Sequence, residues 1–256
     1  MNNLGKVCEL ETKDGIEKLF FELASESRMA LMCELLEKDW KLNDLARKLD
    51  LTPTEAFRQL QRLTEVLLVQ KLPEGTYGIT SLGKLVLQLV DPLEFVFKHS
   101  EYFLTHDVWQ LPHHFISRIG DLSQTNLQLD TIASINKVTQ MIKEADDYLW
   151  GIGESPGFAD SGAIMKEKIL KGVHLKFLGP NNISSNIFSP IPSLRFEVRV
   201  ISKIPVFLLL SEKEAAVGFR SIQGRLDYYG FYGQDPLFLN WAKDLFLYHW
   251  ERAKIG

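Results

Sequence analysis

The side chains best suited to recognising a partner by hydrogen bonding gather in one short stretch, residues 52–62. Thr54, Arg58 and Arg62 follow one another at intervals of four residues, with Gln59 beside them. On an α-helix this spacing places them on one side. Arginine can donate two hydrogen bonds to guanine, and glutamine can pair with adenine, where the start of a helix enters the major groove. The pattern favours recognition of duplex DNA, although such residues could also simply solvate a surface helix.

The letters TPTE give this stretch a defined helix start. Thr52 is a good N-cap, Pro53 suits the first helical position, and Glu55 stands three residues after the cap, which is the spacing of a capping box. Upstream, residues 26–39 and 42–49 show helical periodicity. We therefore expect a helix-turn-helix whose second helix begins at Thr52. Its inward face is expected to carry Ala56, Leu60, Leu63 and Leu67.

A β-hairpin is expected directly after this helix. Residues 66–72 are apolar and strand-like, PEGT supplies turn residues, and residues 77–80 return. A helix-turn-helix followed by a hairpin is a winged helix, and the hairpin of such a fold commonly lies along the DNA. The expected DNA contacts are therefore Thr52, Thr54, Arg58, Gln59, Arg62, Lys71 and Tyr77.

Composition limits the kinds of protein that this chain can be. Apolar residues make up 45% and charged residues 24% of its 256 residues, as in soluble globular proteins. No apolar run approaches the roughly 20 residues of a membrane span, and the first residues do not resemble a secretion signal. We expect a cytoplasmic protein with no membrane partner. Cys8 and Cys33 suit neither a disulfide framework nor a zinc site, and we expect no metal and no cofactor.

The charge of the chain limits how it could bind DNA. A formal net charge of −4 disfavours coating nucleic acid without specificity, because that task needs a strong positive field. Charges are also nearly balanced along residues 13–90, where Glu55 and Glu65 accompany the arginines of the expected recognition helix. One copy should bind DNA only modestly, which favours a homodimer on two half-sites. The same balance keeps open an adaptor whose winged helix binds a protein.

An aromatic and apolar segment, residues 83–125, follows the hairpin. Residues 83–108 are apolar on all sides, which indicates burial on more than one side. Packing against a second copy would provide that burial. Asp91 and Pro92 suit the cap and first position of a fresh helix. We therefore expect a helical connector that also serves as a dimerisation region.

Three histidines recur every seven residues in this segment, at His99, His106 and His113. The spacing suggests a metal site or a pH sensor. We favour structural roles for them, since Pro112 should interrupt the helix before His113 and no carboxylate cluster lies close in the sequence.

Residues 126–256 alternate between helix and strand patterns and predict an α/β domain. Helices are expected at 127–146, 163–171 and 234–252, and strands at 148–152, 174–178, 194–200, 205–210 and 215–219. Ligands of α/β proteins bind near the carboxyl ends of strands, and arginines could hold an anionic metabolite in bidentate fashion or merely line a solvent face. The candidate ligand contacts are Gly151, Gly153, Glu154, Ser155, Arg195, Arg199 and Arg220.

Several motifs resemble those of known regulators. The stretches SESRMALMCELL, LNDLARKLDLTPTEAFRQLQRLTEVLLV and YGITSLGKLV are similar to winged helices of the ArsR and MarR classes. Together with FLTHDVWQLP, YLWGIG, GVHLKFLGP and LNWAKDLFLYHWERA, they make nearly the whole chain resemble the FilR-type family of archaeal methanogenesis regulators. This resemblance implies a winged helix joined to a regulatory domain that is distantly similar to TrmB effector domains and to phospholipase D folds.

The similarity to phospholipase D can be tested on particular residues. His174 and Lys176 form an H-x-K pair, but Asn181 stands where these enzymes place Asp, and no second copy of the motif occurs. The enzymes need a histidine nucleophile and a histidine acid from two motifs. We therefore expect no enzyme activity, and a phosphodiesterase is the least favoured alternative.

Three parts are thus expected along the chain: an α+β winged helix-turn-helix domain at residues 1–82, a helical connector at 83–125, and an α/β regulatory domain at 126–256. The favoured function is sequence-specific, homodimeric regulation of transcription on double-stranded DNA. A small-molecule effector, with an anion as one candidate, is expected to modulate it through the C-terminal domain.

Overall fold

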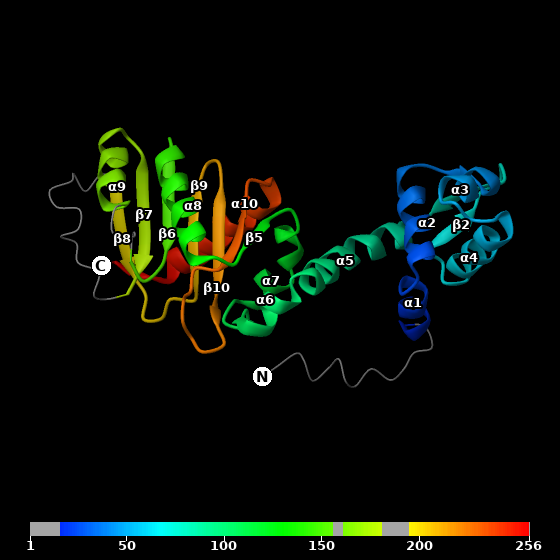
Figure 1. The fold of residues 1–256 in the computed structure, drawn as a ribbon, viewed down its shortest axis with the longest axis horizontal. Coiled ribbons are helices and arrows are strands. Elements are labelled where there is room, and N and C mark those ends of the chain that lie inside the picture. The colour runs from blue at the N-terminus through cyan, green and yellow to red at the C-terminus, as the bar shows by residue number, and fades with distance from the viewer. Residues whose placement is uncertain (1–15, 156–160, 181–194, 256) are drawn as a thin grey trace. The chain divides into compact units, whose positions relative to one another are not determined.

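The computed structural model describes residues 16–155, 161–180 and 195–255, and the chain divides into two compact units, Met1–Asp91 and Pro92–Gly256 (Figure 1). The sequence predicted boundaries after residues 82 and 125, whereas the structure has one boundary, after Asp91. The reason lies in packing: Phe95, Tyr102 and Phe115 are buried in the main core of the second unit. The expected connector is thus mostly part of that unit.

From residue 16 onwards, where the structure describes it, the first unit consists of four helices, a hairpin and the start of a fifth helix. Its elements are α1 (Ile16–Leu23), α2 (Glu26–Glu37), β1 (Trp40–Lys41), α3 (Leu42–Lys48), α4 (Pro53–Glu65), β2 (Val69–Lys71), β3 (Thr76–Ile79) and α5 (Ser81–Lys98). The antiparallel strands lie in the order β1-β3-β2. The order of elements is the one expected for a winged helix, with α3 and α4 joined by a short turn.

Apolar faces of α2, α3 and α4 close the core of the first unit. Leu35, Leu45, Leu60 and Leu63 are almost fully buried there, and each such side chain contributes about 1.5–3 kcal/mol to folding. Leu67 does not join them, because it follows the end of α4 with a φ of 63° and is 66% exposed.

Asp91 and Pro92 do not begin a new helix, as the sequence predicted, but lie within helix α5. The helix runs from Ser81 to Lys98 without interruption, and Pro92 lies inside it. The Pro92 ring packs so closely on Gly120 that a Cβ at Gly120 would lie 2.7 Å from Pro92 Cγ. The helix thus continues through Pro92, whose ring packs against Gly120. The sequence pattern alone predicts an interruption at this proline.

The described residues of the second unit form nine strands and the helices that cover them. After α5 come α6 (Ser100–Thr105), β4 (His106–Asp107), α7 (His113–Ile116), η2 (Ile119–Leu122), β5 (Asn126–Gln128), α8 (Thr131–Glu144), β6 (Tyr148–Ile152), α9 (Ser161–Leu170), β7 (His174–Gly179), β8 (Phe196–Val200), β9 (Val206–Ser211), β10 (Ala215–Ser221), β11 (Gly230–Gly233), α10 (Pro236–Arg252) and β12 (Lys254–Ile255). Within the described residues, no helix is long and apolar enough to cross a membrane.

The sheet of this unit has the strand order β12-β8-β7-β6-β9-β10-β11-β5, with β4 paired to β10. Strands β6, β7 and β8 are parallel, and the other pairs are antiparallel. Helices α8 and α9 cover one face through Val138, Met141 and Met165. Helix α10 covers the other through Trp241 and Phe246. The result is a three-layer α/β unit (Figure 1).

The expected α/β pattern of this unit holds, with local corrections. The helix expected from residue 127 begins at Thr131, because residues 126–128 form the edge strand β5 against β11. Strands β4, β11 and β12 were not expected. They are two to four residues long, too short for their own periodicity to reveal them.

Candidate nucleic-acid interface

Helix α4 starts at the capping box that its sequence predicts. The Thr52 hydroxyl accepts a hydrogen bond from the Glu55 backbone at 3.2 Å, and the Thr52 backbone donates to the Glu55 carboxylate at 3.0 Å. The Thr52 hydroxyl, followed by its backbone N–H, lowers the pKa of Glu55. A capped start stabilises a helix by about 1 kcal/mol and fixes its first turn. The first turn, which should carry the base contacts, is therefore held in place.

Three polar side chains on the outward side of α4 have no partners in the described part of the protein. Thr54, Arg58 and Gln61 are exposed, and their spacing places them opposite the buried Ala56 and Leu60. No hydrogen bond or ion pair ties these three side chains to other described residues. They are the outward row of α4, and they remain available for an external partner.

Arg62 and Gln59 lie elsewhere, in an ion-pair network on the side of α4. Arg62 binds both carboxylate oxygens of Glu22 on α1, at 2.9–3.2 Å. Arg28 of α2 binds the same carboxylate at 2.8 Å and donates to the Gln59 side-chain oxygen at 2.8 Å. Glu22 and Arg28 are each only 8% exposed. Arg62 and Gln59, which were both expected to contact bases, are thus bonded to other residues of the protein. They do not lie on the outward face of α4, where the sequence pattern placed them.

Two residues of α4 that the sequence did not single out stand outward instead. Gln61 completes the row with Thr54 and Arg58. Phe57 is 47% exposed although it is aromatic, and apolar side chains in a major groove contact the thymine methyl group. The capping box and the buried positions set the phase of the helix, and that phase could have identified both residues from the sequence.

The hairpin places one of its two expected contacts at the surface. Lys71 is exposed at the end of β2. Tyr77 is 6% exposed and belongs to the core, because its backbone pairs with Trp40 and its ring faces inward. Tyr77 is therefore a core residue, and Lys71 remains the cation at the hairpin.

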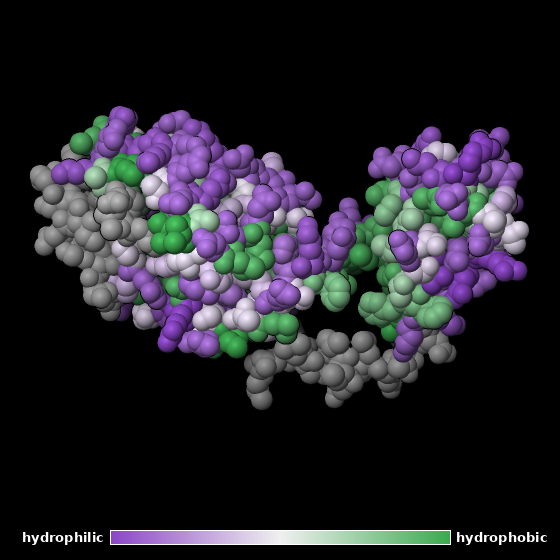
Figure 2. Space-filling model, in the orientation of Figure 1, coloured by the Kyte–Doolittle hydropathy of each residue, from purple (hydrophilic) through white to green (hydrophobic). Residues whose placement is uncertain are grey.

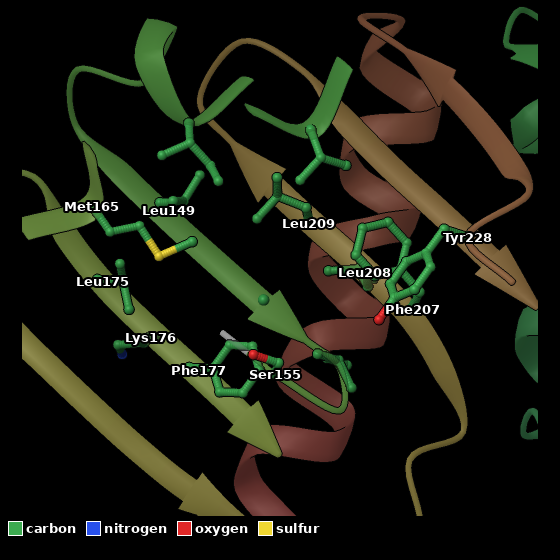
Figure 3. A pocket seen from close by; sticks show the side chains of 14 residues that line it. Leu149, Ser155, Met165, Leu175, Lys176, Phe177, Phe207, Leu208, Leu209 and Tyr228 are labelled. Atoms are coloured by element: carbon green, nitrogen blue, oxygen red, sulfur yellow. The ribbon is translucent and has the colours of Figure 1, made fainter. Parts of the chain in front are cut away.

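In the second unit, the expected ligand loop borders a small apolar cavity (Figure 3). Gly151 and Ser155 line it together with Leu149, Met165, Leu175, Phe177, Phe207 and Tyr228. The space left for water-sized molecules is about 30 Å³, room for one or two waters. Gly153 is buried, and Glu154 forms an ion pair with Arg220 at 3.1 Å. Up to Ser155, the last described residue of the loop, there is therefore no open site of metabolite size.

The three expected arginines do not form a row. Arg195 donates to the Gly172 carbonyl oxygen, and Arg199 donates to that of Trp250 at 2.7 Å while its guanidinium lies 4.6 Å from the Trp250 ring. Arg220 donates to the carbonyl oxygens of Ile204, at 2.6 Å, and of Gly224. Each arginine is engaged at a different place, so the structure does not bring them together around one anion.

The histidines are likewise separate. His106 is buried and contacts Asp227 at 3.0 Å, whereas His113 is exposed. No group of three metal-ligating side chains occurs among the described residues. His174 of the H-x-K pair is exposed, and Lys176 lies 3.5 Å from Glu197. Asn181 lies outside the described residues.

Comparisons with known proteins give only distant structural similarities. No family model matches, and a search of curated proteins found no match. TrmBL2, an archaeal chromatin protein with a novel mode of DNA binding, is 14% identical over 88% of this chain and 92% of its own, with a TM-score of 0.45. NucT from Helicobacter pylori is 11% identical over 52% and 98%, with 0.42. Nuc from Salmonella typhimurium, a phospholipase D family member, is 12% identical over 52% and 96%, with 0.39. At TM-scores below 0.5, nothing about the activity of this chain follows from them.

Proposed function

We propose that this chain is a sequence-specific, DNA-binding transcription regulator whose recognition helix is α4. The observation that carries the proposal is the outward row of α4. Thr54, Arg58 and Gln61 stand exposed on a helix whose start is capped and whose opposite face is buried. Arginine and glutamine there have the donors and acceptors needed to read base edges. The sequence resemblance to FilR-type regulators supports the same class.

We further propose that the regulator binds as a homodimer through α5. Leu82, Leu85 and Leu89 recur at spacings of three and four residues, and they are 46%, 53% and 61% exposed. Figure 2 shows apolar areas among polar ones on the surface of the first unit. Such a stripe suits helix pairing. Two copies would present two recognition helices to a pair of half-sites, which offsets the modest charge of one copy.

We also propose that a small-molecule effector binds to the second unit and regulates DNA binding. Binding there would bias the DNA-bound state only if the effector binds two states of the dimer with different affinity. The proposal includes no catalytic step.

A duplex-binding assay over a series of salt concentrations tests the DNA-binding assignment. Genomic fragments retained by the protein are titrated with the wild type, with Arg58→Ala, and with Lys84→Ala as a control that removes one exposed cation from α5. We expect Arg58→Ala to weaken specific binding about 30-fold or more, because a homodimer would lose one bidentate base contact of about 1–3 kcal/mol in each half-site. The control should stay within about twofold.

The salt series separates DNA binding from the adaptor alternative. Phosphate contacts release counterions, so the logarithm of the affinity should fall linearly with that of the salt concentration. Equal affinity of Arg58→Ala and the wild type, or no retention of duplex DNA at low salt, would overturn the assignment.

A further inference from the structure

A second hollow of the C-terminal unit is open and polar. It lies beside the edge strand β5, between the strand ends of β5 and β11 and the first turns of α8. Its volume is about 770 Å³, within the range of small-molecule sites. The lining residues, here called the carboxamide groove, are Gln124, Asn126, Leu127, Gln128, Ala133, Asn136, Lys137, Gln140, Glu214, Tyr232, Gly233, Gln234 and Asp235.

Six of these lining side chains are carboxamides, and four of them have no hydrogen-bond partner among the described residues. Gln128 accepts from the backbone of Leu129, and Gln140 donates to Glu144. The remaining four all stand exposed in the groove: Gln124, Asn126, Asn136 and Gln234. Each carboxamide offers two donors and one acceptor oxygen. The groove thus presents uncharged donors and acceptors from β5, from α8 and from the turn before α10.

The floor of the groove is fixed by a charge pair. Glu214 stands in the turn between β9 and β10, yet its side chain is only 7% exposed, and it binds the ammonium group of Lys137 on α8 at 2.7 Å. Burial, and then the Glu214 carboxylate among other effects, raises the pKa of Tyr232, which is buried beside the pair. A buried carboxylate costs folding free energy unless it is paired. The pair therefore holds α8 against the strand ends and gives the groove a fixed shape.

The charges of the groove disfavour ionic ligands. Its cation, Lys137, is already neutralised by Glu214. The Asp235 carboxylate caps α10 by accepting from the backbone of Leu237 at 2.9 Å. An anion would thus meet two carboxylates and a paired ammonium, and a cation would meet two carboxylates that are already engaged. A planar base would find Tyr232 buried rather than presented for stacking.

We infer that the carboxamide groove binds an uncharged small molecule that carries several adjacent hydroxyl or amide groups. Such groups are both donors and acceptors, and they match the free carboxamides without displacing the Lys137–Glu214 pair. Only the role of this ligand as the effector rests on the proposed function. It replaces the arginine-lined anion site expected from the sequence with a different place and a different chemistry.

Thermal unfolding of the full chain with defined probes tests this inference. Myo-inositol and sucrose supply hydroxyl groups, cyclic diglycine supplies amides, and citrate and spermidine are charged controls. We expect at least one uncharged probe at about 10 mM, where stabilisation by exclusion of the solute from the protein surface is small, to raise the melting temperature by about 2 °C or more. The hydroxyl and amide sets show which source is preferred. Asn136→Ala combined with Gln234→Ala should abolish that rise, whereas Asn240→Ala, an exposed amide on α10, should keep it.

Three results would overturn the inference: no rise with any uncharged probe, a rise confined to citrate or spermidine, or a rise that the double variant keeps. The experiment contains no DNA. A protein that binds an uncharged probe but fails to retain duplex DNA would therefore contradict the proposed function and leave the groove assignment standing.

Discussion

At the residue scale, the side chains that look alike in the sequence divide into two roles. Arg58 and Arg62 are one helical turn apart, but Arg58 is exposed and Arg62 binds Glu22. Glu22 is buried between Arg62 and Arg28, so one carboxylate compensates two cations. The network joins α1, α2 and α4 along one side of α4. The proposed base reading therefore depends on Arg58, and the ion pairs give Arg62 a structural role.

Replacing Glu22 by Gln should test that structural role. Arg28 would lose its compensating charge while still buried, and breaking a buried pair costs about 3–5 kcal/mol. Arg62→Ala should cost only about 1 kcal/mol or less, because Arg62 is 43% exposed. Urea unfolding followed through amide exchange in α4 measures both. Glu17→Gln, an exposed change on α1, serves as the control. Equal stability of Glu22→Gln and the wild type would contradict the account.

At the element scale, the proposed function gives α4 and α5 complementary roles. The capping box and the buried row Ala56, Leu60 and Leu63 fix where α4 starts and which side it presents. Helix α5 carries buried Val86 and Leu87 on one side and the exposed leucines on another. Exposed leucines at helical spacing are unfavourable in a monomer, since each leaves apolar area in water. This cost is the physical reason for assigning dimerisation to α5.

Charges placed on the α5 stripe should separate the copies. Leu85→Lys with Leu89→Lys would put four ammonium groups into a two-copy interface, and we expect the dimer dissociation constant to rise at least about 100-fold. Gln88→Lys adds a charge on an exposed side of the same helix and should leave the dimer unchanged. Sedimentation equilibrium measures the mass of each variant. A wild type that is monomeric at micromolar concentration would contradict the dimer directly.

At the scale of the whole molecule, the sequence predicts what local interactions determine. The start of α4 follows from Thr52 and Glu55, which are three residues apart, and the strands around residues 148–152 and 206–211 follow from their own apolar runs. The part of the fold missed is non-local. Strand β5 exists through pairing with β11, about one hundred residues away in the chain, and no pattern within three residues can show this.

The difference between local and non-local interactions also explains which parts of the candidate sites the sequence could predict. Arg62 and Glu22 are 40 residues apart, and Arg220 and Glu154 are 66 apart. Residue type indicated where cations occur, but only the fold shows which carboxylate each one meets. The sequence did not reveal the carboxamide groove, because the lining of the groove comes from segments between residues 124 and 235. Uncharged side chains scattered over such a length form no motif.

Selection of duplexes from a random pool tests whether the outward row of α4 reads bases. The wild type should enrich a motif with two related half-sites, one from each copy. Arg58→Ala should lose the preference at one base pair of each half-site and keep the rest, because one bidentate contact specifies one base. Arg62→Ala should enrich the wild-type motif. An unchanged motif for Arg58→Ala, or a pool from which the wild type enriches nothing, would contradict the claim.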